Sequence, residues 1–119
     1  MSCSSLRFAR FRQGRRQGHA LVEGELLRPI SGSPFGRWRS GEETIPLSAV
    51  RLLAPVRPSK ILAVALNYRS HLGQFDRSAE PANPELFLKP PSALIGPGEA
   101  IVLPAAAGRV DYEGELVAV

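Results

Sequence analysis

Glycine and proline interrupt this chain so often that it has little room for a long helix. Each of the two supplies 11 of the 119 residues, together about 18% of the chain against roughly 12% in an average protein. Glycine is costly inside a helix and proline removes a backbone donor, so both favour turns between short elements. The sequence therefore predicts a mainly β fold of the α+β class, in which short strands alternate with turns.

Composition narrows the class of protein further. Hydrophobic residues make up 44% and charged residues 22% of the chain, near the globular average, which excludes wholesale disorder. Cys3 is the single cysteine, which excludes an internal disulfide framework. The longest internal apolar run, residues 61–66, is far shorter than the roughly 18 residues of a membrane span, and no apolar signal core follows Met1. We expect a cytoplasmic protein without a membrane partner, built as one modest domain or as part of a larger one.

The first half of the chain predicts a small β-rich domain over residues 1–57. Its pieces are a strand at 6–12, a strand at 19–30, a loop at 31–41 and an extended stretch at 42–56. The first two strands form a hairpin around a turn that contains Gly14. The only tryptophan, Trp38, is expected to pack back over this hairpin.

The second half, residues 58–119, predicts the beginning of a second domain. Its pieces are a buried strand at 61–66, a loop at 67–80, an extended piece at 85–89 and a strand at 109–119. The last strand has the clearest alternation of the chain, and it reaches Val119 without a residue that would end it. A strand there needs a neighbour for its backbone groups, so we expect a truncated chain whose missing part would complete the core.

Two carboxylates lie close together in this last predicted strand. Glu113 and Glu115 are separated by one residue, which places both on the same face of an extended strand, about 6.6 Å apart. Such a pair can converge on a hard divalent ion, which prefers oxygen ligands. A solvated strand face explains the same spacing, and Glu23 and Glu25 repeat it elsewhere in the chain. The spacing alone leaves both readings open.

The two histidines differ in their sequence setting. His71 lies a few residues after the predicted buried strand, in a region where strand ends present catalytic side chains from a rigid scaffold. A histidine that only forms hydrogen bonds in a surface loop fits the same position. His19, at a strand start, is expected to be structural.

Basic residues gather at the start of the chain, and the first sixteen positions contain no acidic residue. The cluster consists of Arg7, Arg10, Arg12, Arg15 and Arg16, with Phe8 and Phe11 between them. Arginines beside aromatic residues can bind nucleic acid. Strand alternation sends the two phenylalanines to opposite faces, however, so they cannot form one stacking platform. A solvated hairpin explains the arginines, and we expect no nucleic-acid partner.

Three ordered segments resemble the fumarylacetoacetate hydrolase family. They are residues 60–71, ending in Asn67-Tyr68-Arg69-Ser70-His71; residues 86–98, with Lys89-Pro90-Pro91-Ser92; and residues 110–116, with Asp111-Tyr112-Glu113-Gly114-Glu115. The first half, including residues 32–36, resembles the small domain that precedes the catalytic domain in many bacterial members. The resemblance implies that residues 58–119 begin a fumarylacetoacetase-like catalytic domain, a mixed β-roll that usually dimerises. A homodimer is therefore expected for the full-length protein.

The resemblance also implies roles for individual residues. Glu113 and Glu115 correspond to two of three carboxylate ligands for Mg2+, Mn2+ or Ca2+, and the third ligand, an Asp, has no counterpart in this sequence. His71 corresponds to the catalytic histidine, a general base. Many hydrolytic members pair it with a Glu three positions on, where this chain has Gln74, which can hold a water but cannot accept a proton. Ser70 likewise stands where many relatives carry Asp.

The activity implied by the resemblance is metal-dependent chemistry on small carboxylic acids. The substrates are 2-oxo acids or 2-hydroxydienedioates, and hydrolysis, isomerisation, tautomerisation and decarboxylation share a metal-stabilised enolate. Gln74 favours the non-hydrolytic reactions. Arg69 and Lys89 are candidates to bind the substrate carboxylate, although Lys89, before two prolines, equally fits a role in shaping the loop. The alternative is a catalytically idle member or fragment that acts as a binding or scaffold protein, and we expect little activity from these 119 residues alone.

Overall fold

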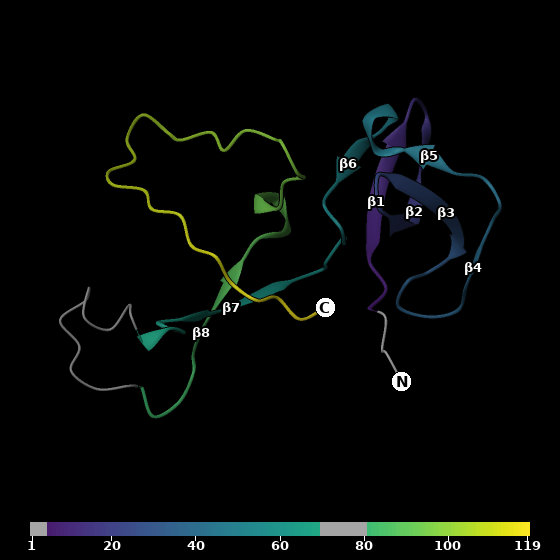
Figure 1. Ribbon diagram of the computed structural model, residues 1–119. Coiled ribbons are helices and arrows are strands. Elements are labelled where there is room, and N and C mark those ends of the chain that lie inside the picture. The colour runs from purple at the N-terminus through teal and green to yellow at the C-terminus, as the bar shows by residue number, and fades with distance from the viewer. Residues whose placement is uncertain (1–4, 70–80) are drawn as a thin grey trace.

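The computed structural model describes residues 5–69 and 81–119, and most of its regular elements are strands (Figure 1). The strands are β1 (Phe8–Gln13), β2 (Arg16–Glu23), β3 (Leu26–Gly32), β4 (Trp38–Ser40), β5 (Ile45–Pro46), β6 (Arg51–Leu53), β7 (Ile61–Ala65) and β8 (Glu85–Lys89). Two 3-10 turns, η1 (Leu47–Ala49) and η3 (Pro91–Ala93), accompany them. The prediction of a mainly β chain is confirmed. In the described part of the chain, no helix is both long enough and apolar enough to cross a membrane.

The first six strands form one antiparallel sheet in the order β4-β3-β2-β1-β6, and β5 pairs with β3. Glycines with positive φ make the first two turns, Gly14 at 56° between β1 and β2 and Gly24 at 61° between β2 and β3. The predicted single strand at 19–30 is therefore wrong. Gly24 divides this segment into two strands that pair with each other. Apolar residues on both sides of Gly24 make the segment look like one continuous strand in the sequence.

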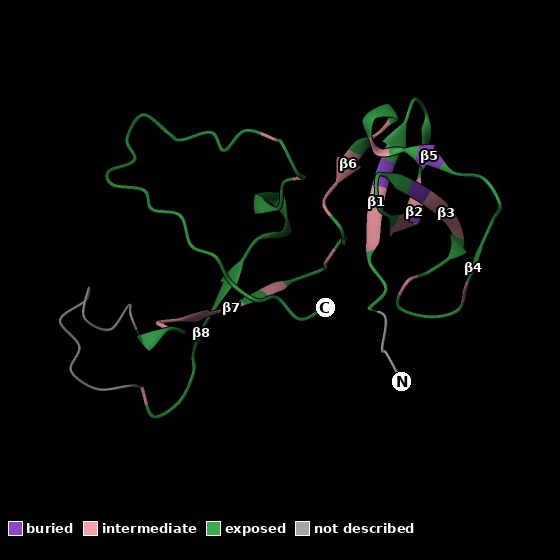
Figure 2. Ribbon diagram, in the orientation of Figure 1, coloured by how far each residue is buried: buried purple, intermediate pink, exposed green. Residues whose placement is uncertain are grey.

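The core of this sheet lies on one face and is small. Phe11, Ala20, Leu27 and Ile45 are the buried hydrophobic residues, and they come from β1, β2, β3 and β5 (Figure 2). Four strands thus contribute one buried side chain each. Since side chains alternate between the faces of a strand, Arg10 and Arg12, on either side of Phe11, point from the opposite face of the sheet.

The opposite face carries the aromatic contact expected for Trp38. The rings of Trp38 and Phe8 meet edge to face, with centroids 5.5 Å apart and planes at 79°, a favourable geometry for an aromatic pair. The prediction that Trp38 packs over the hairpin is confirmed. The prediction of a loop throughout residues 31–41 is wrong at both ends, because β3 continues to Gly32 and Trp38 begins β4 and pairs with Gly32.

β7 and β8 form a separate two-stranded antiparallel sheet. The predicted strand at 61–66 and extended piece at 85–89 are both present, but the expected burial of the first is wrong. Leu62 is 62% exposed, and all five residues of β8 are exposed (Figure 2). A two-stranded ribbon has two open faces and two open edges, so an apolar sequence alone does not bury it.

Glu99 connects the segment after β8 to the first sheet. Its carboxylate accepts a hydrogen bond from the backbone N–H of Gly96 at 2.9 Å and forms an ion pair with Arg51 of β6. These contacts lower the pKa of Glu99, the Gly96 hydrogen bond most strongly and the Arg51 hydrogen bond next. The two halves of the chain are thereby linked through one carboxylate.

The predicted strand at residues 109–119 is wrong. These residues have no regular secondary structure and are all exposed, and among the described residues no strand pairs with them. Apolar and polar residues do alternate in this segment. A strand also needs backbone hydrogen bonds to a neighbouring strand, and alternation in the sequence does not provide that neighbour.

Candidate active site

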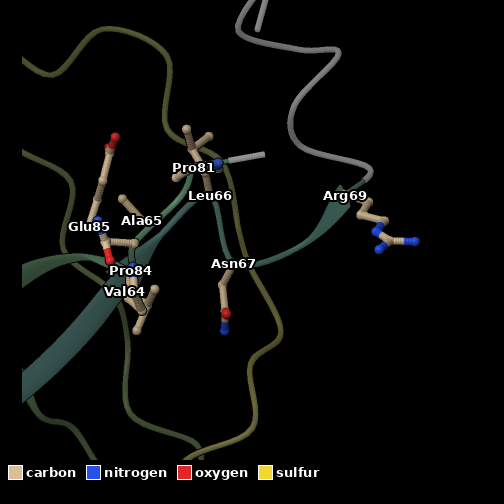
Figure 3. Close-up of a pocket in the computed structure, with 9 residues that line it drawn as sticks. Val64, Ala65, Leu66, Asn67, Arg69, Pro81, Pro84 and Glu85 are labelled. Atoms are coloured by element: carbon tan, nitrogen blue, oxygen red, sulfur yellow. The ribbon is translucent and has the colours of Figure 1, made fainter. Parts of the chain in front are cut away.

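A hollow of about 270 Å³ lies at the end of β7, and we call it the β7 pocket (Figure 3). It is lined by Val64, Ala65, Leu66, Asn67, Arg69, Pro81, Asn83, Pro84 and Glu85. The chain leaves β7 at Leu66, and Glu85 is the first residue of β8. The pocket therefore combines the end of one strand with the beginning of its partner, a place where a rigid scaffold presents side chains to a ligand.

The backbone at the mouth of this pocket is unusual. Leu66 has a φ of 54°, in the left-handed region, and it is the one non-glycine residue with positive φ in the described part of the chain. A side chain with a Cβ pays roughly 1–2 kcal/mol for this conformation. Such outliers concentrate at functional sites, because the surrounding structure must hold them in place.

The two predicted carboxylate-binding cations lie at different ends of the β7–β8 ribbon. Arg69 lines the β7 pocket, to one side of the other lining residues in Figure 3. Lys89 ends β8 and pairs with Ile61, whereas Glu85 pairs with Ala65 at the pocket. Four residues of strand separate the two ends, about 13 Å. The structure thus places Arg69 at the candidate site and does not bring Lys89 to it.

Lys89 has another contact that explains its position. Its Nζ lies 5.5 Å from the centroid of the Phe87 ring, within range of a cation–π interaction. Pro90 follows directly in an extended conformation, and Pro91 begins η3. This contact lies within β8, so both predicted roles of Lys89 stay predictions.

Glu113 and Glu115 lie in the exposed segment after residue 108, on either side of Gly114. The nearest preceding carboxylate, Asp111, forms an ion pair with Arg109 at 2.9 Å. Within residues 5–69 and 81–119, no three His, Cys, Asp or Glu side chains gather in a way that could hold a metal ion. The two glutamates supply the hard oxygen donors that Mg2+ prefers, so the donor chemistry fits, but they make only part of a ligand set.

His71 and Gln74 lie outside the described residues, so their predicted roles stay predictions. Sequence reasoning did not single out Leu66, Asn67 or Glu85, which line the β7 pocket beside Arg69. Asn67 had a recognisable signal, a turn-forming residue directly after an apolar run. Leu66 had none, because leucine gives no indication of a left-handed backbone.

The chain is thus a β-rich protein with a six-stranded sheet and a two-stranded sheet, and the β7 pocket lies at the end of β7 in the second sheet. The chain belongs to the fumarylacetoacetate hydrolase family. Residues 60–119 match the family described as fumarylacetoacetate (FAA) hydrolase C-terminal, and residues 6–55 match the Rv2993c-like N-terminal domain. The resemblance noted in the sequence is therefore confirmed.

Relatives and solved structures agree with this assignment. Protein Rv2993c of Mycobacterium tuberculosis is 42% identical over 107 residues, covering 84% of this chain and 40% of that protein. The mitochondrial oxaloacetate tautomerase Fahd2a of Rattus norvegicus is 43% identical over 76 residues, 63% of this chain and 24% of its own length. The crystal structure of 5-carboxymethyl-2-hydroxymuconate delta-isomerase from Mycobacterium smegmatis superposes with a TM-score of 0.71 at 36% identity, covering 84% of this chain and 39% of that one. The chain thus spans at most about two fifths of the length of these relatives.

Proposed function

We propose that this protein is a divalent-metal-dependent enzyme that isomerises or tautomerises small 2-oxo or 2-hydroxydienedioic acids. The observation that carries the proposal is the family match over residues 60–119, which contains Arg69, Glu113 and Glu115. Two of the relatives are named as a tautomerase and an isomerase. Hydrolysis and decarboxylation use the same enolate, but Gln74 lacks the basicity expected of the partner of a hydrolytic base.

Glu113 and Glu115 would hold Mg2+, or Mn2+ or Ca2+ in its place, through their carboxylate oxygens. Such an ion, when bound, supplies positive charge that stabilises an enolate. The remaining tasks fall to side chains of this chain. Arg69, at the β7 pocket, binds a substrate carboxylate through charge-assisted hydrogen bonds. His71 moves the proton to or from the substrate carbon through one imidazole nitrogen, while Gln74 orients a water.

The proposal is tested by metal binding and turnover measured together on the longest polypeptide that the gene encodes. Glu113→Gln and Glu115→Gln should each weaken Mg2+ binding in calorimetry by tenfold or more. Substitution of residues that only orient metal ligands already costs about 10–100-fold in affinity, and a ligand itself should cost at least as much. They should lower the rate of oxaloacetate enol–keto interconversion in parallel. Glu25→Gln is the matched control, because Glu25 belongs to the other Glu-x-Glu sequence and lies exposed in the β2–β3 turn. Unchanged Mg2+-dependent turnover in both variants would refute the proposal.

The second candidate is a catalytically idle family member that serves as a binding or scaffold protein. The observation that favours it is Gln74 in place of the acidic partner of the base. We expect the 119 residues alone to show little turnover under either candidate. Turnover of oxaloacetate or an acylpyruvate by the complete gene product would exclude the idle one.

A further inference from the structure

A second hollow, of about 280 Å³, opens on the first sheet, and its lining shares no residue with the β7 pocket. We call it the arginine pocket, since Arg10 of β1 and Arg57 of the connector after β6 both line it. His19 of β2 pairs directly with Arg10 across the strands, so both side chains leave the same face. The volume is close to the lower end of the usual range for small-molecule sites.

The arginine pocket concentrates positive charge. None of its described lining residues is acidic. The Arg10 guanidinium donates from Nη1 to the carbonyl oxygens of Ala54 at 2.6 Å and Val56 at 3.4 Å, neutral acceptors that leave its charge unbalanced. Burial, followed by repulsion from Arg57 and Arg12, lowers the pKa of Arg10, and burial followed by the charge of Arg10 lowers the pKa of His19.

Other arginines of the same region are balanced by carboxylates. Arg16 forms a bidentate pair with Glu43 at 2.8 and 2.9 Å. Arg28 pairs with Glu23 at 2.9 Å. Arg16 and Arg28 thus each have a carboxylate partner, whereas the described lining of the arginine pocket offers none to Arg10 and Arg57.

The Gln17 amide increases the number of unsatisfied donors in this pocket. With its carbonyl toward Arg12, it accepts hydrogen bonds from Nε and Nη2 at 3.1 and 2.8 Å. In the reverse orientation it accepts a single long bond of 3.4 Å from Arg57. The first orientation is better satisfied, and it turns the amide N–H groups toward Arg57. Two sets of donors then face each other, and an anion oxygen that lies beside both nitrogens would accept from both.

We propose that the arginine pocket binds the oxyanion group of a small ligand, a phosphoryl or a carboxylate group, between Arg10 and Arg57. Guanidinium groups match the geometry of both anions through paired N–H donors. Phe35, which lines the same hollow and is 63% exposed, offers an apolar surface to the rest of the ligand. This site is separate from the residues of the proposed catalysis, so either proposal can fail without the other.

The test is calorimetric titration of the whole 119-residue chain with inorganic phosphate and, separately, with succinate at constant ionic strength. One of the two should bind with saturable heat, and the tighter one identifies the group that the pocket prefers. Arg57→Gln should weaken that binding about tenfold, the size expected for one charge-assisted contact. Arg10→Lys keeps the charge but loses the paired donors, and it should weaken binding several-fold.

Arg15→Gln is the matched control, because it removes the same charge from an exposed position in the β1–β2 turn. It should change the affinity by less than twofold. Absence of saturable heat with both anions at millimolar concentration would overturn the proposal. An equal loss of affinity in Arg15→Gln and Arg57→Gln would overturn it as well, since binding would then follow net charge alone. Because Arg57 is exposed, Arg57→Gln should keep the circular dichroism spectrum of the parent, which separates a loss of binding from a loss of fold.

Discussion

The second half of this chain is richer in apolar residues than the first, with 30 in residues 60–119 against 22 in residues 1–59. Yet within the described residues only the first half buries any of them completely. All four buried hydrophobic residues lie in the first sheet, between Phe11 and Ile45. In the described part of residues 60–119 no residue is buried, and Leu86, Leu88, Ile101 and Val102 are all more than 60% exposed. Six strands with one common face can enclose a core, whereas two strands cannot. Burial thus depends on the number of neighbouring strands, and hydropathy alone does not decide it.

A leucine-to-alanine substitution made in each half tests this difference in burial most directly. Leu27→Ala, at a side chain with 0% exposure, should lower the free energy of unfolding by about 2–5 kcal/mol, because it removes packing and leaves a cavity. Leu88→Ala, at 70% exposure, should change it by less than about 0.5 kcal/mol. Urea denaturation followed by circular dichroism measures both. Equal losses would show that the second half has a core of its own.

A smaller effect is expected from glycine substitutions. Gly32 has a φ of 92°, and a Cβ there would collide with the carbonyl oxygen of Arg37. Gly32→Ala should therefore cost about 1–3 kcal/mol through backbone strain. Gly114→Ala is the matched variant, because a Cβ at Gly114 meets nothing within 4 Å, and it should stay within about 0.5 kcal/mol of the parent. Thermal melting distinguishes the two, and a melting temperature unchanged by Gly32→Ala would contradict the constraint.

The smallest expected effect is a loss of stability at low pH through two ion-paired carboxylates, Glu43 and Glu23. A hydrogen bond from Arg16, aided by its charge, lowers the pKa of Glu43, and Arg28 lowers the pKa of Glu23 in the same way. A carboxyl whose pKa is lower in the folded state stabilises the fold fully above its ordinary pKa of 4.5. That contribution is lost as the pH falls below this value and through the folded-state pKa.

The melting temperature of the first sheet should accordingly decline slightly between neutral pH and about pH 3. Glu43→Gln should reduce the slope of this decline, whereas Glu25→Gln, for which the structure gives no ion pair among the described residues, should leave it unchanged. An identical slope in the parent and in Glu43→Gln would contradict the role of the Arg16 contact.

Local signals predicted much of the first sheet. Alternation and Gly14 located β1 and its turn into β2, and Trp38 was placed over the hairpin correctly. Gly24 also carried its signal, but the apolar residues on both sides made β2 and β3 look like one strand. The second half was less predictable, because residues 109–119 carry a strand pattern without a partner strand in the described chain. Alternation of apolar and polar residues predicts which side chains share a face of a strand, but it does not predict which strand the backbone pairs with.

The candidate site was predictable only in part. The segment around Arg69 could be located, since it follows an apolar strand that the structure confirms as β7. The separation of Arg69 from Lys89 could not, because the register of β7 with β8 decides it. The arginine pocket was hidden for a similar reason. Arg10 and Arg57 lie far apart in the sequence and meet only when β6 pairs with β1 and brings the connector alongside.

The two contacts of the Glu99 carboxylate make the link between the halves sensitive to protonation. One carboxylate fixes the Gly96 turn and the side chain of Arg51 simultaneously. Adding a single proton to that group removes its charge, which weakens the ion pair with Arg51 and the hydrogen bond from Gly96. Acid should therefore weaken the contact between the segment beyond β8 and the first sheet, and no buried side chain takes part in that contact.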